Sequence, residues 1–428
     1  MYEDLKFNNN NPGVLDYVGK KLAKEIDIND LKKLKPEKRA EKIYVVLKEI
    51  IDIEKIIISE KEIPKLVKEI YEDTFGLGPI STLINDDRVT EIMINNWNDI
   101  YMEESGIIKK TNIRFRSADH IRNLVEKILG PLGLRVDESS PMVDARLDDG
   151  SRINIVLKPV STNDVVMTVR KFKRNILNAE DLVRLGTLNK NISDFIKICV
   201  QSKLNIIISG ATSTGKTTFL NVISNFIPAD ERIITIEDTL ELNLNLNHVV
   251  RLESRPTNLE GKGEITIRDL VRNSLRMRPD RIIVGEIRGI EAIDTLQAMN
   301  TGHDGSMTTI HANSPMDLLS RLETMLLMSG INLNPSSARR VISSSIDMII
   351  HLERLSDGKR ILSSLSEITN SSKTINNSST LEVKEIFKLQ DQDKKTPDNL
   401  IYTGKMPGFI NKIKGKGLYD DFKNTLWG

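Results

Sequence analysis

Glycine, lysine and threonine residues in the middle of the chain have the spacing of a phosphate-binding loop. Gly210, Gly215, Lys216 and Thr217 fit the pattern G-x-x-x-x-G-K-[ST], directly after an apolar run at 206–208. The glycines let the backbone turn its N–H groups inward, where they and a helix N-terminus can hold a polyphosphate. The lysine adds charge at the β- and γ-phosphates, and the threonine hydroxyl can bind Mg²⁺. A glycine-rich turn without a nucleotide is the alternative, which the complete pattern before an expected helix at 218–226 disfavours. We predict a triphosphate site made of these residues: Gly210, Ala211, Thr212, Ser213, Thr214, Gly215, Lys216, Thr217 and Thr218.

Acidic residues follow two further apolar runs. The run at 233–236 ends in Glu237 and Asp238, and the run at 282–284 leads to Gly285 and Glu286. Because open α/β sheets hold ligands at the carboxyl ends of their strands, we expect these acids beside the phosphates. Mg²⁺ takes oxygen ligands and keeps several waters, so Thr217, Glu286 and Asp238 are its expected ligands. Glu237 or Glu286 would orient or deprotonate the attacking water, and the pattern does not decide between them.

A histidine follows the expected strand at 306–310. His311 could report the state of the γ-phosphate through a neutral hydrogen bond, although a single histidine at a strand end is more often a structural group. Its position downstream of the phosphate loop favours the functional interpretation.

Arginines form another set. Arg268, Arg272 and Arg276 recur every four residues, and we interpret this stripe as internally paired or solvated. In a ring-forming motor, an arginine can instead reach phosphate bound by the same or a neighbouring subunit, which accelerates hydrolysis by roughly 10³–10⁵. Arg152 and Arg170 are the candidates for this role, since they lie next to an expected hairpin turn and just before a linker.

The composition and the spacing of apolar residues divide the chain into four parts. Helical spacing predicts a helical region at 1–72, with a flexible start at 8–13. Short strands at 89–94, 99–103, 107–113 and 165–172, a helix at 118–128 and a hairpin at 144–157 predict a mixed α/β domain at 73–173. Strands alternate with helices over 174–355, which indicates a wound parallel sheet. The polar remainder, 356–428, is expected to be an appended region, with a loop at 371–380.

The bulk composition excludes several classes of protein. The 428 residues include 61 basic and 60 acidic ones, so the chain has no large net positive charge that would attract nucleic acid. We therefore expect no direct nucleic-acid partner. One cysteine, Cys199, rules out a disulfide within the chain and a four-cysteine zinc site. There is no long apolar stretch and no signal-peptide pattern. We expect a cytoplasmic protein that is held at a membrane only through partners.

With these residues in view, the chain resembles the secretion ATPases of type II secretion and type IV pilus systems, most closely their CpaF/Tad-pilus branch. The similarity covers about 75–355. It is carried by the phosphate loop and by the stretches FGLGPISTLI, VDESSPMVDARLDDGSRIN, ITIEDTLEL, NLEGKGEITIRDLVRNSLRMRPDRIIVGEIRG and LQAMNTGHDGSMTTIHANSP.

The resemblance implies a hexameric ATPase that uses ATP and Mg²⁺. Its fold would be α/β: a RecA-like P-loop core, a PAS-like α/β N-terminal domain and an extra N-terminal helical region. Domain motion would push on an inner-membrane platform protein. By this resemblance Glu237 and Asp238 belong to the Asp box, Glu286 is the Walker B glutamate and His311 belongs to the His box. Arg152 and Arg170 are then the arginines that reach phosphate.

Two other functions stay open on the sequence alone. One is a nucleic-acid translocase or conjugation-type motor, although aromatic residues for base stacking are scarce. The other is a regulatory subunit that binds nucleotide without hydrolysing it, which the combination of Lys216, Glu286 and His311 disfavours.

Overall fold

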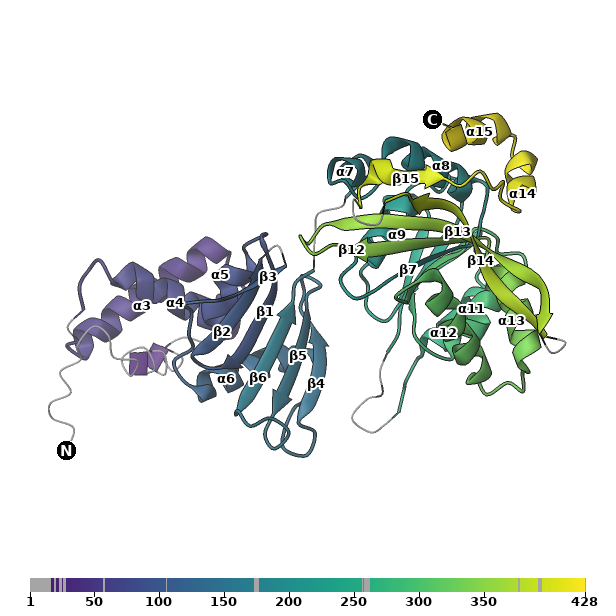
Figure 1. Ribbon diagram of the computed structural model, residues 1–428. Coiled ribbons are helices and arrows are strands. Elements are labelled where there is room, and N and C mark those ends of the chain that lie inside the picture. The colour runs from purple at the N-terminus through teal and green to yellow at the C-terminus, as the bar shows by residue number, and fades with distance from the viewer. Residues whose placement is uncertain are drawn as a thin grey trace. The chain divides into compact units, whose positions relative to one another are not determined.

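A computed structural model describes residues 17–427, except 19–20, 23–24, 26–27, 57, 105, 173–176, 256, 258–261, 376–377 and 392–394. The chain forms two compact units, 1–174 and 175–428 (Figure 1). The expected flexible start at 8–13 and most of the expected linker lie outside the described residues.

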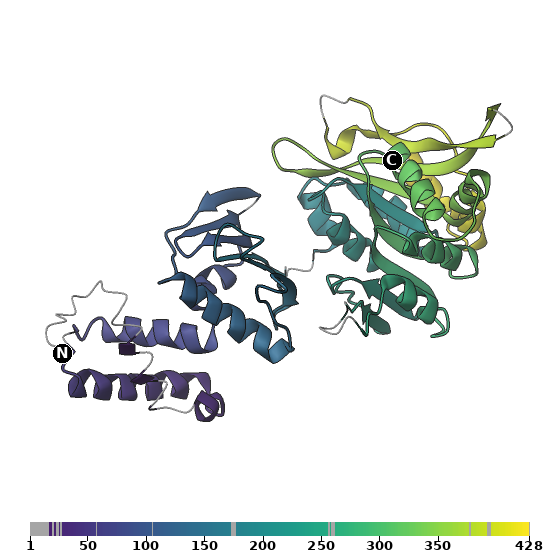
Figure 2. The same ribbon diagram turned by 90° about the horizontal axis from the view of Figure 1, so that it is seen from below.

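The first unit begins with the helices α2 (Ile28–Lys32), α3 (Pro36–Ile53), α4 (Ile63–Phe75) and α5 (Ser81–Ile84), with a 3-10 turn, η1 (Gly78–Ile80). The first three share a core of their own, whereas Ile80 and Leu83 belong to the core of the sheet that follows. Helices α3 and α4 lie side by side in both views (Figures 1 and 2). Proline stands in the first turn of each, where its fixed φ suits a helix start and its missing N–H costs no hydrogen bond. Ile43, Leu47 and Ile70 bury the facing sides of these helices.

A six-stranded antiparallel sheet follows, in the order β3-β2-β1-β6-β5-β4. Its strands are β1 (Val89–Asn96), β2 (Asp99–Glu104), β3 (Ile107–Lys110), β4 (Met142–Arg146), β5 (Arg152–Leu157) and β6 (Val165–Arg170). Helix α6 (Ala118–Leu129) packs its apolar side on one face, and a second 3-10 turn, η2 (Gly130–Leu132), follows it. The expected helix, strands and hairpin of this region are all present, within a few residues of their predicted bounds.

The second unit is built on a nine-stranded sheet in the order β15-β14-β13-β12-β7-β11-β10-β8-β9. The strands are β7 (Ile206–Gly210), β8 (Ile233–Glu237), β9 (Val249–Glu253), β10 (Arg281–Ile287), β11 (Met307–His311), β12 (Met348–Arg354), β13 (Arg360–Ile375), β14 (Ser378–Leu389) and β15 (Leu400–Tyr402). The six strands from β12 to β9 are parallel. This is the wound parallel sheet that alternating strands and helices predict.

Helices cover both faces of this sheet, so its central strands are apolar on both sides. Ile206 and Ile208 of β7 face one layer and Ile207 faces the other. The first layer contains α7 (Ala179–Arg184), α8 (Lys190–Gln201), α9 (Lys216–Ser224), α14 (Ile410–Gly415) and α15 (Tyr419–Trp427). The second contains α10 (Ile267–Ser274), α11 (Glu291–Asn300), α12 (Pro315–Leu327) and α13 (Pro335–Ser345).

The residues after 355 continue the same sheet. Strand β13 pairs antiparallel with β12, and β14 and β15 follow outward. The predicted loop at 371–380 is therefore wrong: 371–375 and 378–380 are the ends of β13 and β14, where Thr374 pairs with Ser379 after an irregularity in the register. Backbone hydrogen bonds between the two strands hold this polar segment, and they need no apolar side chains.

Candidate nucleotide site

The phosphate loop lies at the carboxyl end of β7 and leads into α9, as its sequence requires. Gly215 has φ 89°, in the left-handed region where a side chain would be strained, and it is the N-cap of α9. At Gly210 an added Cβ would lie 2.5 Å from Thr214 Oγ1 and 2.6 Å from the Leu352 carbonyl oxygen. Gly215 is therefore required by its backbone conformation, and Gly210 is required by the close packing around it.

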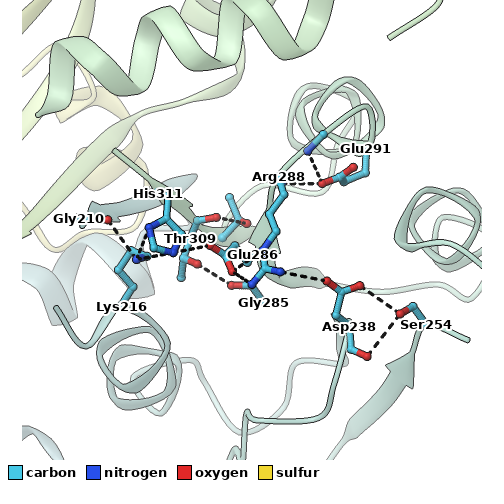
Figure 3. A network of polar contacts seen from close by, with 12 residues as sticks. Gly210, Lys216, Asp238, Ser254, Gly285, Glu286, Arg288, Glu291, Thr309 and His311 are labelled. Atoms are coloured by element: carbon cyan, nitrogen blue, oxygen red, sulfur yellow. Dashed lines mark hydrogen bonds and ion pairs between the residues drawn. The ribbon is translucent and has the colours of Figure 1, made fainter. Parts of the chain in front are cut away.

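Lys216 reaches back over this loop. Its buried ammonium donates to the carbonyl oxygens of Gly210 at 3.1 Å and Ala211 at 3.0 Å, and lies 3.4 Å from both ring nitrogens of His311 (Figure 3). Burial lowers the pKa of Lys216 to about 8, with Glu286 acting in the opposite direction. A phosphate group here would supply the negative charge that favours the charged lysine.

Glu286 and His311 come together because β10 and β11 are adjacent and parallel. His311 Nε2 lies 3.2 Å from Glu286 Oε1 (Figure 3). Burial, and then the neighbouring charge of Lys216, lower the pKa of His311, so the neutral ring is favoured at neutral pH. Glu286 Oε1 is buried, and this contact with His311 does not have the geometry of a hydrogen bond. A buried carboxylate oxygen that accepts no hydrogen bond beside a phosphate loop is suited to an incoming water or cation.

Arg288 holds the other oxygen of Glu286, a contact that the sequence interpretation did not single out. Its Nε and Nη2 donate to Glu286 Oε2 at 2.8 and 2.5 Å, and its Nη1 lies 3.9 Å from Asp238 Oδ2 (Figure 3). A signal was present, since Arg288 directly follows β10 and residues two apart in an extended chain share a face. Asp238 itself is exposed and accepts a hydrogen bond from Ser254 Oγ at 3.1 Å.

Glu237 is buried on the neighbouring strand, β8. Its Oε2 accepts hydrogen bonds from the backbone N–H groups of Glu241 at 2.7 Å and Leu242 at 2.8 Å, while its Oε1 has no partner. Burial raises the pKa of Glu237 to about 7, against the effect of these two bonds. The packing of Glu237 accounts for the glycine at position 285. An added Cβ there would lie 3.1 Å from Glu237 Cγ, so an aspartate before Glu286 would crowd Glu237.

The residues fit a magnesium nucleotide. Among the described residues, no group of three or more histidine, cysteine or acidic side chains is placed to hold a metal alone. A P-loop does not need such a cage, because the metal takes one hydroxyl, phosphate oxygens and waters. Thr217 is half-buried at the start of α9 and Thr214 is buried, whereas Ala211, Thr212, Ser213 and Thr218 are exposed.

Two arginine groups differ in their surroundings. Arg268 and Arg272 both donate to the buried Asp294 of α11 at 2.7 Å, so internal pairing of that stripe is confirmed for these two. Arg152 and Arg170 face each other across β5 and β6. They alternate with the buried residues Ile153 and Val169 and therefore lie on the sheet face opposite α6. These two belong to the first unit and Lys216 to the second.

The chain is similar to proteins of a known family. Residues 73–396 match the family described as type II/IV secretion system protein. The type IV secretion system protein VirB11 of Bartonella henselae is 31% identical over 320 residues, covering 66% of this chain and 89% of the relative. Conjugal transfer protein TrbB of Rhizobium radiobacter is 29% identical over 303 residues, covering 70% and 89%. The crystal structure of the Brucella suis VirB11 ATPase is 26% identical and covers 69% of this chain and 97% of that one, with a TM-score of 0.37.

The chain belongs to the type II/IV secretion system family, and it is an ATPase with a RecA-like P-loop core. Within the part of the chain that the structure describes, no helix is both long and apolar enough to span a bilayer.

Proposed function

We propose that this chain is a Mg²⁺-dependent hexameric ATPase that powers assembly of a Tad-type pilus, or of a related secretion machine, through an inner-membrane platform protein. It would act at the inner face of the cytoplasmic membrane and reach that membrane through its partner. The observation that carries the hydrolytic part is the cluster of Lys216, Glu286 and His311, with contacts of 3.2–3.4 Å beside a complete phosphate loop. The choice of the Tad branch rests on the sequence resemblance.

In this proposal the loop amides bind the α- and β-phosphates, and Lys216 binds the β- and γ-phosphates and stabilises charge on them. Thr217, with Glu286 and Asp238, would hold Mg²⁺, which neutralises charge developing on the phosphates. Glu286 or Glu237 orients the attacking water and accepts its proton, and neutral His311 senses the γ-phosphate. Arg152 and Arg170 complete the site, from the same or a neighbouring subunit.

The hydrolytic assignment is tested with Lys216→Ala and Glu286→Gln in the full chain. Lys216→Ala removes the charge at the phosphates, and we expect loss of both nucleotide affinity and turnover. Glu286→Gln keeps the size of the side chain, so we expect ATP binding to persist while steady-state turnover falls by about 10²–10⁴-fold, the usual contribution of a general base. Lys190→Ala is the control, since Lys190 is exposed on α8, where it pairs with Asp194 at 2.7 Å. Turnover near wild type in either site variant would refute the assignment.

A conjugation-type motor is the second candidate, and the named functions of relatives such as TrbB favour it. It predicts that DNA stimulates the ATPase rate and that DNA affinity falls steeply with salt, because phosphate contacts release counterions. ATPase rates with and without single- and double-stranded DNA, at two salt concentrations, decide between the candidates. Stimulation by DNA would favour the conjugation-type motor, and its absence together with stimulation by a pilus platform protein would favour the first proposal.

A further inference from the structure

The turn between β12 and β13 brings a basic residue from beyond the expected ATPase boundary onto the phosphate loop. Strand β12 runs parallel to β7 with Leu352 opposite Gly210, so its end lies beside the start of the loop. The chain then turns over 355–359, closed by the Leu355 N–H donating to the Lys359 carbonyl at 2.8 Å. Strand β13 begins with Arg360, paired with Arg354.

Arg360 lies against the outer side of the loop. Its Nε donates to the backbone carbonyl of Ser213 at 3.0 Å. Its Cδ lies 3.0 Å from the position that a Cβ at Gly215 would occupy, so the stem of Arg360 covers this glycine. Loop amides that turn inward to phosphate leave carbonyls directed outward, and Arg360 binds one of them.

The loop needs such outside support because its backbone is unusual at two positions. Ser213 has φ 61° and Gly215 has φ 89°, both in the left-handed region. A serine there is unfavourable by on the order of 1 kcal/mol, so contacts around the loop must stabilise that conformation. The hydrogen bond from Arg360 to the Ser213 carbonyl acts directly on the strained residue.

We propose that Arg360 is a positioning residue of the nucleotide site, which holds the phosphate loop in the conformation that presents its amides. This inference rests on the proposed nucleotide site and extends it to a residue outside the phosphate loop. Because the loop amides contact phosphates that ADP and ATP share, Arg360 sets the affinity for both nucleotides to the same extent. Uniform binding of this kind changes KM and leaves kcat nearly unchanged.

The test uses the full chain with Arg360→Ala, Arg360→Gln and Arg360→Lys. Steady-state kinetics give kcat and KM for ATP, and a fluorescent ADP analogue gives a dissociation constant. We expect Arg360→Ala and Arg360→Gln to raise both KM and the ADP dissociation constant by roughly 10-fold, the effect of losing one charged hydrogen bond, with kcat within about two-fold of wild type. Arg360→Lys, which keeps a charged donor, is expected to recover part of the affinity.

Arg354→Ala is the matched control, because Arg354 is the exposed cross-strand partner of Arg360 and its removal changes the net charge equally. We expect its KM to match that of wild type. The proposal is overturned if Arg360→Ala and Arg360→Gln behave like Arg354→Ala, or if they lower kcat with no change in KM. Turnover by Lys216→Ala would instead refute the ATPase assignment itself. Inactive Lys216→Ala with an unaltered Arg360→Ala would refute only the role of Arg360.

Discussion

Two acidic side chains on the neighbouring strands β8 and β10 have opposite electrostatic surroundings. Glu286 is paired with Arg288, and its second oxygen lies toward His311. Glu237 is deeply buried, accepts only backbone hydrogen bonds through Oε2, and has a pKa raised to about 7. A carboxyl group with a pKa near the working pH suits proton transfer, whereas an ion-paired carboxylate suits metal binding and water positioning. Both groups are candidates for the proton acceptor of the proposed mechanism, Glu237 through its raised pKa and Glu286 through its position beside His311 and the phosphate loop.

The raised pKa of Glu237 predicts how stability changes with pH. The folded state binds this proton more tightly than the unfolded state, whose pKa is near 4.5, so the contribution of Glu237 to the free energy of unfolding falls as pH rises from 4.5 to about 7. The full loss is on the order of 3 kcal/mol. Glu237→Gln can still accept both backbone hydrogen bonds and has no charge to bury. We therefore expect the variant to be more stable than wild type at pH 8, with little difference at pH 4.5.

Urea unfolding of both proteins at pH 4.5, 6 and 8 measures this difference. Glu367→Gln is a suitable comparison, because Glu367 is a buried carboxyl group of the same unit that is paired with Lys384, and its loss should destabilise the protein. A constant stability difference between Glu237→Gln and wild type over the whole range would contradict the prediction.

At the scale of elements, the close packing of β7, the phosphate loop and β12 makes Gly210 sensitive to substitution. In Gly210→Ala the new methyl group would meet the Thr214 hydroxyl and the Leu352 carbonyl, which is backbone and cannot rotate away. We expect a loss of about 1–3 kcal/mol in stability from overpacking, and weaker ATP binding because the loop must shift.

Gly415→Ala is the control for this substitution. Gly415 ends α14 in the same unit, and an added Cβ there has no atom within 4 Å. It should leave stability unchanged or raise it by up to about 1 kcal/mol, since alanine restricts the unfolded chain. Urea unfolding and nucleotide titration of both variants provide the measurement. Equal stability and affinity in Gly210→Ala and Gly415→Ala would show that the loop does not depend on this contact.

Local sequence was sufficient where one segment determines its own structure. The apolar run at 206–208 predicted β7, and the spacing of Gly210, Gly215 and Lys216 predicted the loop and the start of α9. The hairpin of β13 and β14 was missed because serine, threonine and asparagine are typical of loops, while backbone pairing between two consecutive strands holds them here. Arg360 contacts Ser213 across 147 residues of sequence, a distance that no local pattern spans.

At the scale of the whole molecule, the family match spans the two units, since residues 73–396 include most of both. The proposed ATPase site needs side chains from both units: Lys216 from the second unit, and Arg152 and Arg170 from the first. Covalent linkage alone does not require that both come from one chain. In a ring, each subunit could supply its arginines to the nucleotide of its neighbour, which would couple successive hydrolysis events.

Mixing two inactive variants distinguishes these arrangements. Lys216→Ala has a defective phosphate loop with intact arginines, and the double variant Arg152→Ala, Arg170→Ala has the opposite defect. If arginines act between subunits, some interfaces in a mixed assembly combine an intact loop with intact arginines.

For random mixing at equal amounts, about a quarter of interfaces would be of this kind. We therefore expect recovery of up to roughly one quarter of wild-type turnover. This recovery would be measurable, because loss of such arginines lowers the rate of hydrolysis by roughly 10³–10⁵-fold. If arginines act within one chain, every site in the mixture is defective and activity stays at the level of the separate variants. Subunits must exchange for the comparison to hold, and native mass measurement of the mixture, with one variant carrying a mass label, verifies both exchange and the expected six-subunit ring.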